Sequence, residues 1–182
     1  MGAMVVRVVI QPSFGLPRFR RNWARTLDQS VPFRGETLGP ALTAAERVAL
    51  DRLHPDGVAH FWGATAAHDK RMARIGTGDV VLLTGRKRVL AVGEVGLVFR
   101  NPAFARAMWD PEPGTCPWDN VYSLLHLAHT EIPYETVWAL DGFRAGDNFM
   151  GLRLLDPARG ATVLAGLGIT TATHGDAFTV AA

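Results

Sequence analysis

Phe61-Trp62-Gly63-Ala64-Thr65 opens the stretch of sequence that decides the fold. His68-Asp69-Lys70-Arg71-Met72 and Gly78-Asp79-Val80-Val81-Leu82 follow it. Their apolar and charged periods predict a strand over 58–62, a basic amphipathic helix over 66–75 and a strand over 80–83. A Trp at a strand end, with a helix beginning beside it, places an indole face next to backbone N–H donors. A flat aromatic ligand needs both features.

The rest of the chain predicts more strands than helices. Outside the opening stretch we expect strands over 5–10, 89–98 and 136–140, a helix over 43–53 that begins with the capping box Thr43-Ala-Ala-Glu46, and two segments, 121–129 and 148–155, that fit either strand or helix. Gly85-Arg-Lys-Arg88 predicts a basic hairpin turn, and residues 101–119 predict a loop. The expected fold class is therefore α+β, with a small curved β-sheet or partial β-barrel flanked by two or three short helices.

Length and composition fit one packed domain. The chain has 182 residues, of which 48% are hydrophobic and 20% charged. We expect a single domain over residues 1–168 with a basic loop at 13–40, and a tail or linker over 169–182. The one cysteine, Cys116, excludes an internal disulfide, and no apolar run is long enough to cross a bilayer. A cytoplasmic location without a membrane partner is the resulting expectation.

The order of residues in the opening stretch resembles the YTH and EVE branches of the PUA-like superfamily. The YTH pattern has Trp, a small residue, Thr, Asn, an acidic residue, Lys and a basic residue in that order. Here Trp62-Gly63-Ala64-Thr65 and His68-Asp69-Lys70-Arg71 match it at every position except His68, which replaces the Asn. The EVE pattern of basic helix, Gly-Asp, apolar strand and Gly-containing strand resembles Arg71 through Val95. The resemblance spans roughly positions 58 to 155, without any single diagnostic motif.

This resemblance implies a small β-barrel domain that flips one modified base out of a nucleic acid and holds it in an aromatic cage. Trp109 and Trp118 would close on Trp62, and Thr65, His68 and Asp69 would complete the base pocket. His68 stands where YTH domains carry the Asn that bonds the base edge, so the identity of the base stays open. The alternative for the tryptophans is a structural one, in which they pack under the loop as a satellite cluster.

Arginine supplies 17 of the 19 basic residues, although the net charge is only +2. The planar guanidinium suits phosphates and guanine edges. The residues that we expect on the nucleic-acid backbone are Arg18, Arg20, Arg21, Arg25, Lys70, Arg71, Arg86, Lys87 and Arg88. Phe19 and Trp23 interleave with the first four arginines, and such a segment could wedge into a duplex beside a flipped base.

The expected ligand is DNA carrying methylated cytosine, with N6-methyladenine second and RNA as an alternative nucleic acid. The preference for DNA follows from the family's occurrence in bacterial modification-dependent restriction proteins, where such a domain is fused to a nuclease. A fused or associated nuclease is therefore an expected partner. No cofactor is expected.

We expect no catalytic residue or metal site in this chain. His126 and His129 are three residues apart, but no further ligand is placed to complete a metal site. Two alternatives stay open: an ASCH-like amidohydrolase acting on a modified nucleoside through Lys70, Thr65 and Glu94, and a PUA module that binds RNA regardless of modification. Glu94 follows Gly93 inside a predicted strand, which favours a structural hydrogen bond over catalysis.

Overall fold

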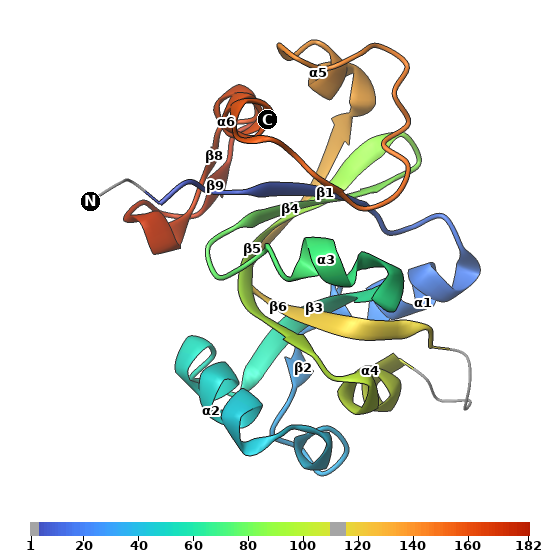
Figure 1. The fold of residues 1–182 in the computed structure, drawn as a ribbon, viewed down its shortest axis with the longest axis vertical. Coiled ribbons are helices and arrows are strands. Elements are labelled where there is room, and N and C mark those ends of the chain that lie inside the picture. Colours follow the sequence, from blue (N-terminus) through green and yellow to red (C-terminus); the bar gives the residue numbers. More distant parts are fainter. Residues whose placement is uncertain (1–3, 110–115) are drawn as a thin grey trace. The chain divides into compact units, whose positions relative to one another are not determined.

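The computed structural model describes residues 4–109 and 116–182, and Figure 1 shows the arrangement of their helices and strands. These residues group into two compact units. Unit 1 comprises Met1–Phe19, Thr77–Glu94 and His126–Ala182, and unit 2 comprises Arg20–Gly76 and Val95–Leu125. The boundary of a single domain at residue 168 stays a prediction.

Hydrogen bonds join seven strands in the order β2-β3-β6-β5-β4-β1-β7. They are β1 (Val8–Pro12), β2 (Val31–Pro32), β3 (Val58–Thr65), β4 (Val80–Gly85), β5 (Arg88–Arg100), β6 (Trp118–Pro133) and β7 (Arg153–Leu154). Strands β2 and β7 are the two ends of this order among the described residues. The predicted α+β class is confirmed. The helices are more numerous than expected, since the described residues contain six short α-helices rather than two or three.

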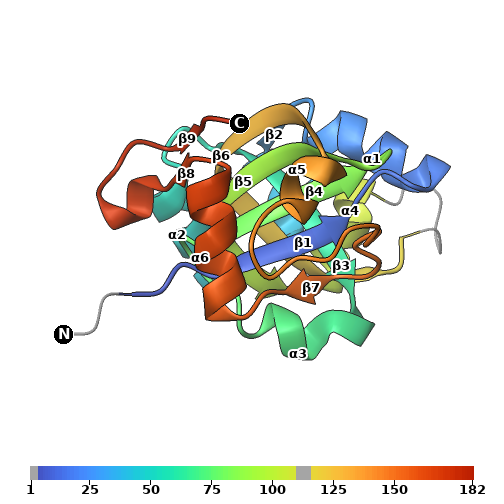
Figure 2. The ribbon, with the colours of Figure 1, turned by 90° about the horizontal axis from the view of Figure 1, so that it is seen from above.

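In unit 1 the core forms where β1 pairs in parallel with β4, in the register Val8↔Val80. Both strands are buried, as a β-branched run without polar alternation predicts. Helix α6 (Pro157–Gly166) lies beside the beginning of β1 and runs across its direction (Figure 2), and a Cβ at Gly160 would lie 3.6 Å from the Val8 side chain. That distance is an ordinary van der Waals contact, so the spacing between helix and strand at this point would also accommodate a methyl group.

The hairpin between β4 and β5 has the turn that its sequence predicts. Gly85 pairs with Arg88, and Arg86 and Lys87 have φ angles of 52° and 56°. Two central residues with positive φ match the right-handed twist of a two-residue hairpin. The prediction of a basic turn at this place is confirmed.

The segment from 169 to 182, expected to be a tail or linker, is folded. It forms β8 (Ile169–Thr170), the 3-10 helix η3 (Ala172–His174) and β9 (Thr179–Val180). Glu94, which is fully buried, accepts hydrogen bonds from the backbone N–H groups of Ala172 at 3.0 Å and Thr173 at 2.8 Å. The predicted structural hydrogen bond of Glu94 is confirmed. Local sequence patterns do not report this contact, because it joins residues 78 positions apart.

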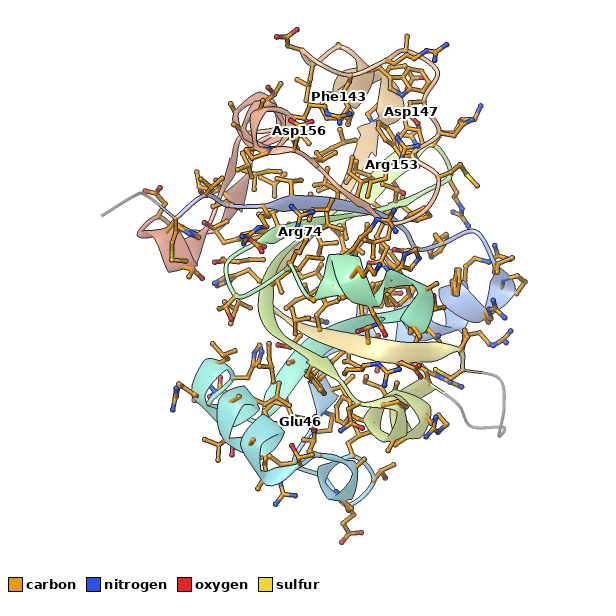
Figure 3. The ribbon with its side chains drawn as sticks, in the orientation of Figure 1. Glu46, Arg74, Phe143, Asp147, Arg153 and Asp156 are labelled. Atoms are coloured by element: carbon orange, nitrogen blue, oxygen red, sulfur yellow. The ribbon has the colours of Figure 1, made fainter. Side chains whose placement is uncertain are left out.

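The strand predicted over 136–140 is wrong, because this segment belongs to helix α5 (Tyr134–Trp138). Tyr134 and Val137 are both buried, three residues apart, which is helical spacing. The segment 148–155 contributes only the two residues of β7. Arg153, at its start, donates to both carboxylate oxygens of Asp147 at 2.6 and 3.0 Å (Figure 3). These hydrogen bonds lower the pKa of Asp147 below its usual value.

In unit 2 the helix predicted from the capping box is confirmed as α2 (Ala44–Leu53). Thr43 accepts a hydrogen bond from the backbone N–H of Glu46, and the Glu46 carboxylate accepts one from that of Thr43. Strand β3 extends three residues beyond the predicted end at Trp62, because residues 60–65 pair with β6. Trp62 therefore lies inside a strand rather than at its end.

The basic loop predicted over 13–40 is wrong for its central part, which forms helix α1 (Pro17–Thr26). Pro17 occupies the first helical position, where the missing N–H is tolerated. Trp23 and Thr26 are buried and lie on one face, whereas the arginines are exposed. The high content of Pro, Gly and Arg concealed this period of buried residues.

The loop predicted over 101–119 is also wrong for α4 (Pro102–Trp109), and residues 110–115 lie outside the described part. Asn101 begins this helix, because its side-chain oxygen accepts from the backbone N–H of Phe104 at 2.8 Å. The helix predicted over 66–75 is shorter than expected. It consists of the 3-10 helix η2 (Ala66–His68) followed by α3 (Asp69–Met72).

Candidate functional site

Three of the six residues predicted for the base pocket meet inside unit 2. Trp62 comes from the middle of β3, Trp109 from the end of α4 and Trp118 from the start of β6. The ring centroids lie 4.8 Å apart for Trp62 and Trp118, 4.7 Å for Trp109 and Trp118, and 6.4 Å for Trp62 and Trp109. All three pairs meet edge to face, the geometry that aromatic rings prefer when they pack on one another.

In this tryptophan cluster (Trp62, Trp109 and Trp118) the three rings pack against one another and are almost completely buried. Their exposed fractions are 0%, 3% and 3%, and Trp23 of α1 adds a further edge contact to Trp62 at 5.9 Å. Gly63 makes the close packing possible, because a Cβ there would lie 2.8 Å from Trp118 Cε3 and 2.8 Å from the backbone oxygen of Asn120. The cluster has the geometry of a packed core. Its role as a base-binding cage stays a prediction.

The indole N–H groups differ in their hydrogen bonding: those of Trp109 and Trp23 donate a hydrogen bond, and that of Trp62 has no partner among the described residues. Trp109 Nε1 donates to the hydroxyl of Thr26 at 3.2 Å, and Trp23 Nε1 donates to the Asp28 carboxylate at 2.9 Å. Trp62 Nε1 is buried and has no hydrogen-bond partner among the described residues. An unsatisfied buried donor of this kind costs about 1–3 kcal/mol. The cluster therefore has one polar atom that the described residues leave unsatisfied.

A polar network lies beside β3 and β6, and it contains another predicted residue, Asp69. Asn120 donates to the Asp69 carboxylate at 2.7 Å and to the backbone oxygen of Thr65 at 3.2 Å. Arg100 lies 3.4 Å from the Asp69 carboxylate and 3.0 Å from that of Asp119. The ladder slips by one residue here, since Ala64 pairs with Asn120 but Thr65 with Trp118. Such a bulge re-aims side chains, which turns Asn120 toward Asp69 and Asp119 toward Arg100.

This network borders an open cleft of about 310 Å³. We call it the Asp69 cleft; it is lined by Asp69, Met72, Ala73, Val98, Phe99, Arg100 and Asn120. Asn120 is only 4% exposed, whereas the side chains of Asp69 and Arg100 are 45% and 52% exposed. The cleft thus combines a fixed amide, an accessible carboxylate and an aromatic ring.

His68, to which the sequence assigns the base-edge contact, lies next to Asp69 in the chain and is half-buried. Burial lowers the pKa of His68 below the usual 6.5, and the positive charge of Arg71 lowers it further. The Nδ1 atom of the imidazole is buried without a hydrogen-bond partner among the described residues. Lys70 and Arg71 are exposed.

Helix α1 presents four exposed arginines, Arg18, Arg20, Arg21 and Arg25, and has no acidic residue in its first turn. The buried side of the helix is held by Trp23 and by Thr26, whose hydroxyl donates to the backbone oxygen of Phe61 at 2.7 Å. Its basic side therefore faces solvent on a rigid support. This is a suitable surface for a polyanion.

Three residues of the β4–β5 turn are predicted to contact the nucleic-acid backbone: Arg86, Lys87 and Arg88. All three belong to unit 1. Arg86 lies over the ring of Phe14 at 4.8 Å, and Arg88 lies 3.6 Å from the carboxylate of Glu131. Lys87 is exposed. Two of these three cations therefore already contact groups of their own unit.

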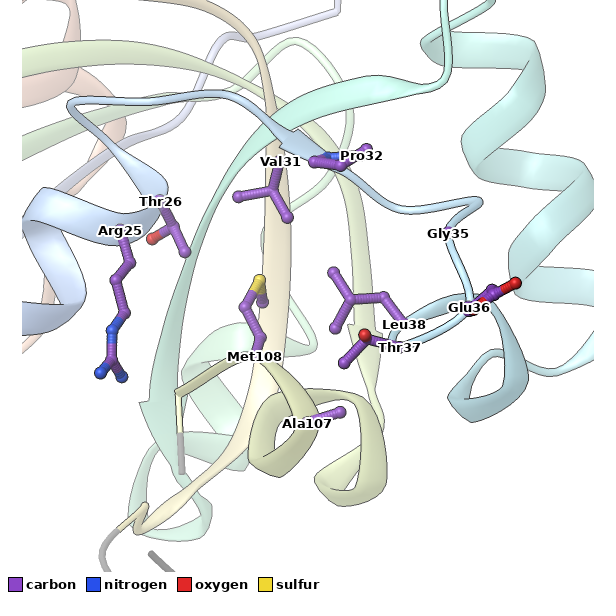
Figure 4. A pocket seen from close by; sticks show the side chains of 10 residues that line it. All are labelled: Arg25, Thr26, Val31, Pro32, Gly35, Glu36, Thr37, Leu38, Ala107 and Met108. Atoms are coloured by element: carbon purple, nitrogen blue, oxygen red, sulfur yellow. The ribbon is translucent and has the colours of Figure 1, made fainter. Parts of the chain in front are cut away.

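A second cavity of unit 2, about 320 Å³ in volume, is shown in Figure 4. It is bordered by the end of α1, the segment 31–38 and the end of α4, with Val31, Leu38 and Met108 among its apolar side chains. The hydroxyl of Thr26 at its wall is already bonded to Phe61 and Trp109. Arg25 and Glu36 add charge to its lining.

The described ranges 4–109 and 116–182 offer neither a metal site nor a membrane span. No group of three or more His, Cys, Asp or Glu side chains is placed to hold a metal ion there. None of the helices in those ranges has the length and apolar character that crossing a membrane requires.

The sequence matches no known protein family, and no curated protein matches it. Among solved structures, it is similar to the N-terminal domain of McrB from Thermococcus gammatolerans, in a structure bound to m5C DNA. The TM-score is 0.65, the identity is 15%, and the alignment covers 89% of this chain and 97% of the McrB domain. The two chains share a fold. At this identity the likeness extends to the fold alone, and the specific resemblance to YTH and EVE domains stays a prediction.

Of the seven residues that line the Asp69 cleft, only Asp69 was predicted as a site residue; the missed ones with an aromatic or polar side chain are Phe99, Arg100 and Asn120. Each lies near the end of a long strand, Phe99 and Arg100 on β5 and Asn120 on β6. The one local indication of this site in the sequence was the amide side chain of Asn120, two residues after Trp118. Nothing in the sequence indicated the β-bulge that turns Asn120 toward Asp69.

Proposed function

We propose that this chain binds DNA that carries a methylated base and recognises the base without altering it. The observation that carries the proposal is the shared fold with the McrB domain, which spans nearly the whole of that domain and was solved with m5C DNA. We further propose 5-methylcytosine as the first ligand and N6-methyladenine as the second. A fused or associated nuclease would then perform any cleavage.

The basic side of α1 supports contact with the DNA backbone. Arg20, Arg21 and Arg25 are exposed on one short helix of unit 2. Guanidinium groups bind phosphate oxygens through paired hydrogen bonds, and each neutralised phosphate releases counterions. A helix held in place by Trp23 presents these charges with little loss of backbone entropy.

Base flipping is the finer part of the proposal. A methyl group in the major groove can be read without flipping, but a pocket that encloses the base reads all its edges. The two cavities described above, of about 310 and 320 Å³, lie at the lower end of the range typical of small-ligand sites. Either is large enough for one base.

The contacts of Glu94 argue against the amidohydrolase alternative. That activity needs a carboxylate free to act on a substrate, whereas Glu94 is fully buried and bonds the backbone of Ala172 and Thr173. Moving it into a reaction would break both hydrogen bonds. The second alternative, a module that binds RNA regardless of modification, is decided by the binding test.

The test is binding of the chain to matched duplexes that differ by one methyl group, at several salt concentrations. We expect tighter binding to the 5-methylcytosine duplex than to its unmodified twin, and a logarithmic salt dependence with a slope of about −0.9 per phosphate contact. Equal affinity for both duplexes, or a preference for unmodified RNA, would overturn the proposal.

The role of α1 is tested in the same assay. Arg21→Ala should weaken binding to both duplexes alike. It should also make the slope of log affinity against log salt concentration shallower by about one unit. Arg52→Ala on α2 removes the same charge from an exposed position of unit 2 outside α1 and serves as the control. If both variants changed the slope equally, the effect would come from net charge and not from contact at α1.

A further inference from the structure

The Asp69 cleft has the shape and polarity that one edge of a pyrimidine requires. Its polar side consists of the Asp69 carboxylate, held by a 2.7 Å hydrogen bond from the buried amide of Asn120. Since the Asn120 amide also donates to the backbone oxygen of Thr65, the carboxylate is tied to strand β3 and not only to its own short helix. Asn120 is thus a positioning residue for Asp69.

The carboxylate keeps acceptor capacity for a ligand. One of its oxygens, Oδ1, accepts the bond from Asn120, and the other, Oδ2, faces the Arg100 guanidinium at 3.4 Å. An ion pair between two half-exposed side chains adds little stability, so a ligand can replace it at small cost. Arg100 would keep its 3.0 Å contact with Asp119 and so remain beside the cleft as a positive charge for a flanking phosphate.

Four of the seven lining residues, Met72, Ala73, Val98 and Phe99, are apolar. Met72 is buried, Val98 and Phe99 are half-buried, and the Phe99 ring is supported by Phe104 at 5.6 Å. A supported aromatic ring at a cavity wall offers a face or edge to a flat heterocycle, and methionine adapts its shape to a small apolar substituent.

We propose that the Asp69 cleft, and not the tryptophan cluster, receives the flipped base, and that Asp69 selects cytosine by accepting a hydrogen bond from its exocyclic amino group. This inference rests on the proposed function and names the base and the residues that read it. The ionised carboxylate only accepts hydrogen bonds, so it pairs with the 4-amino group of cytosine and repels the 4-oxygen of thymine. The C5-methyl group then contacts the apolar lining.

Thymine is the sharpest competitor, because it carries the same C5-methyl group as 5-methylcytosine and differs at position 4 and at the adjacent ring nitrogen. The probes are three duplexes identical except for one base, which is 5-methylcytosine, cytosine or thymine. Each target base is placed opposite an abasic site, so that no pairing energy distinguishes the duplexes. A fourth duplex carries N6-methyladenine.

The wild-type chain should bind the 5-methylcytosine duplex on the order of tenfold more tightly than the thymine duplex. It should bind the cytosine duplex about fourfold less tightly, as expected for one buried methyl group. Asp69→Asn presents an amide that can either accept or donate, so the preference for 5-methylcytosine over thymine should fall to about threefold or less. Phe99→Leu keeps the wall apolar but removes the aromatic ring, and it should weaken binding to every duplex that carries a methylated base.

Glu36→Gln is the matched control, because it removes one carboxylate charge from the other cavity of unit 2. It should leave the ratio of 5-methylcytosine to thymine unchanged. If the wild type prefers methylated DNA but Asp69→Asn keeps the full ratio, the base binds elsewhere and the inference fails while the proposed function stands. If the wild type ignores the methyl group, the proposed function itself fails. Tighter binding of N6-methyladenine than of 5-methylcytosine would overturn the assignment of cytosine.

Discussion

The tryptophan cluster and the Asp69 cleft lie in the same unit and share strand β6, which supplies Trp118 to the cluster and Asn120 to the cleft, yet they differ in exposure and in the contacts that hold them. In the cluster no ring is more than 3% exposed, whereas in the cleft the Asp69 carboxylate is 45% exposed. The cluster is held by packing and the cleft by hydrogen bonds. A single stretch of sequence therefore supplies a rigid support and an open, polar surface, and motif similarity alone does not tell the two apart.

The largest effect should follow loss of the central ring of the cluster. Trp62→Ala should lower the free energy of unfolding by about 3–5 kcal/mol, because it leaves a cavity among Trp23, Trp109 and Trp118. Urea denaturation followed by circular dichroism measures the change. Trp62→Phe retains most of the volume and removes the unsatisfied N–H, and it should cost much less.

A different result would reverse the comparison. If Trp62→Ala unfolded at the same urea concentration as the wild type but lost its preference for methylated DNA, the cluster would be a binding site and not a support.

Gly63→Ala should have the next largest effect. The added Cβ would lie 2.8 Å from Trp118 Cε3 and 2.8 Å from the backbone oxygen of Asn120, so the strands or the ring must shift. Overpacking of this kind costs about 1–3 kcal/mol. Gly76→Ala is the control, since a Cβ at this position would meet no atom within 4 Å and the φ of Gly76 is not positive. Equal melting temperatures for the two variants would show that the cluster is loosely packed.

The pH dependence of stability compares two histidines: His54, which is buried, and His68, which precedes Asp69 in the chain. Burial, followed by the charge of His60, lowers the pKa of His54, and its Nε2 lies 2.8 Å from the Ser123 hydroxyl. Since the unfolded chain binds protons more readily than the folded one, stability should be complete above about pH 6.5 and fall as the pH is lowered below that value.

His54→Gln should make this acid-side decline shallower than His68→Gln does, because the His54 ring is more deeply buried. Melting temperatures between pH 5 and 8 measure both variants. An identical decline in the two variants would contradict the difference between the closed and open regions.

The smallest effect on stability should come from the residue with the largest expected effect on base selection. Asp69→Asn should change the free energy of unfolding by no more than about 1 kcal/mol, because its ion pair with Arg100 is half-exposed. The same urea experiment measures it. A larger loss would mean that Asp69 is mainly structural, and its effect on base preference would need correction for unfolding.

The parts of the fold that could be predicted from sequence are those fixed by neighbouring residues. The capping box at Thr43 and the basic hairpin turn at Arg86 each depend on two to four adjacent positions. Helices α1 and α4 were missed because their Pro-rich and Gly-rich surroundings favour loops, whereas burial of Trp23 and Phe104 stabilises the helical state. That burial depends on partners from other elements, such as Trp62 and Phe61.

For the candidate site, the sequence identified the residue types that matter and the tertiary structure decided how they are used. By itself the sequence predicted that Trp62, Trp109 and Trp118 come together and that Asp69 lies near them, and it shows four arginines between residues 18 and 25. Only the tertiary structure decided that the three rings fill their own space and that Asn120, across the sheet, fixes Asp69 beside an open cleft. The physical reason is that exposure and hydrogen-bond partners depend on contacts between residues distant in the chain, such as Asp69 and Asn120, which are 51 positions apart.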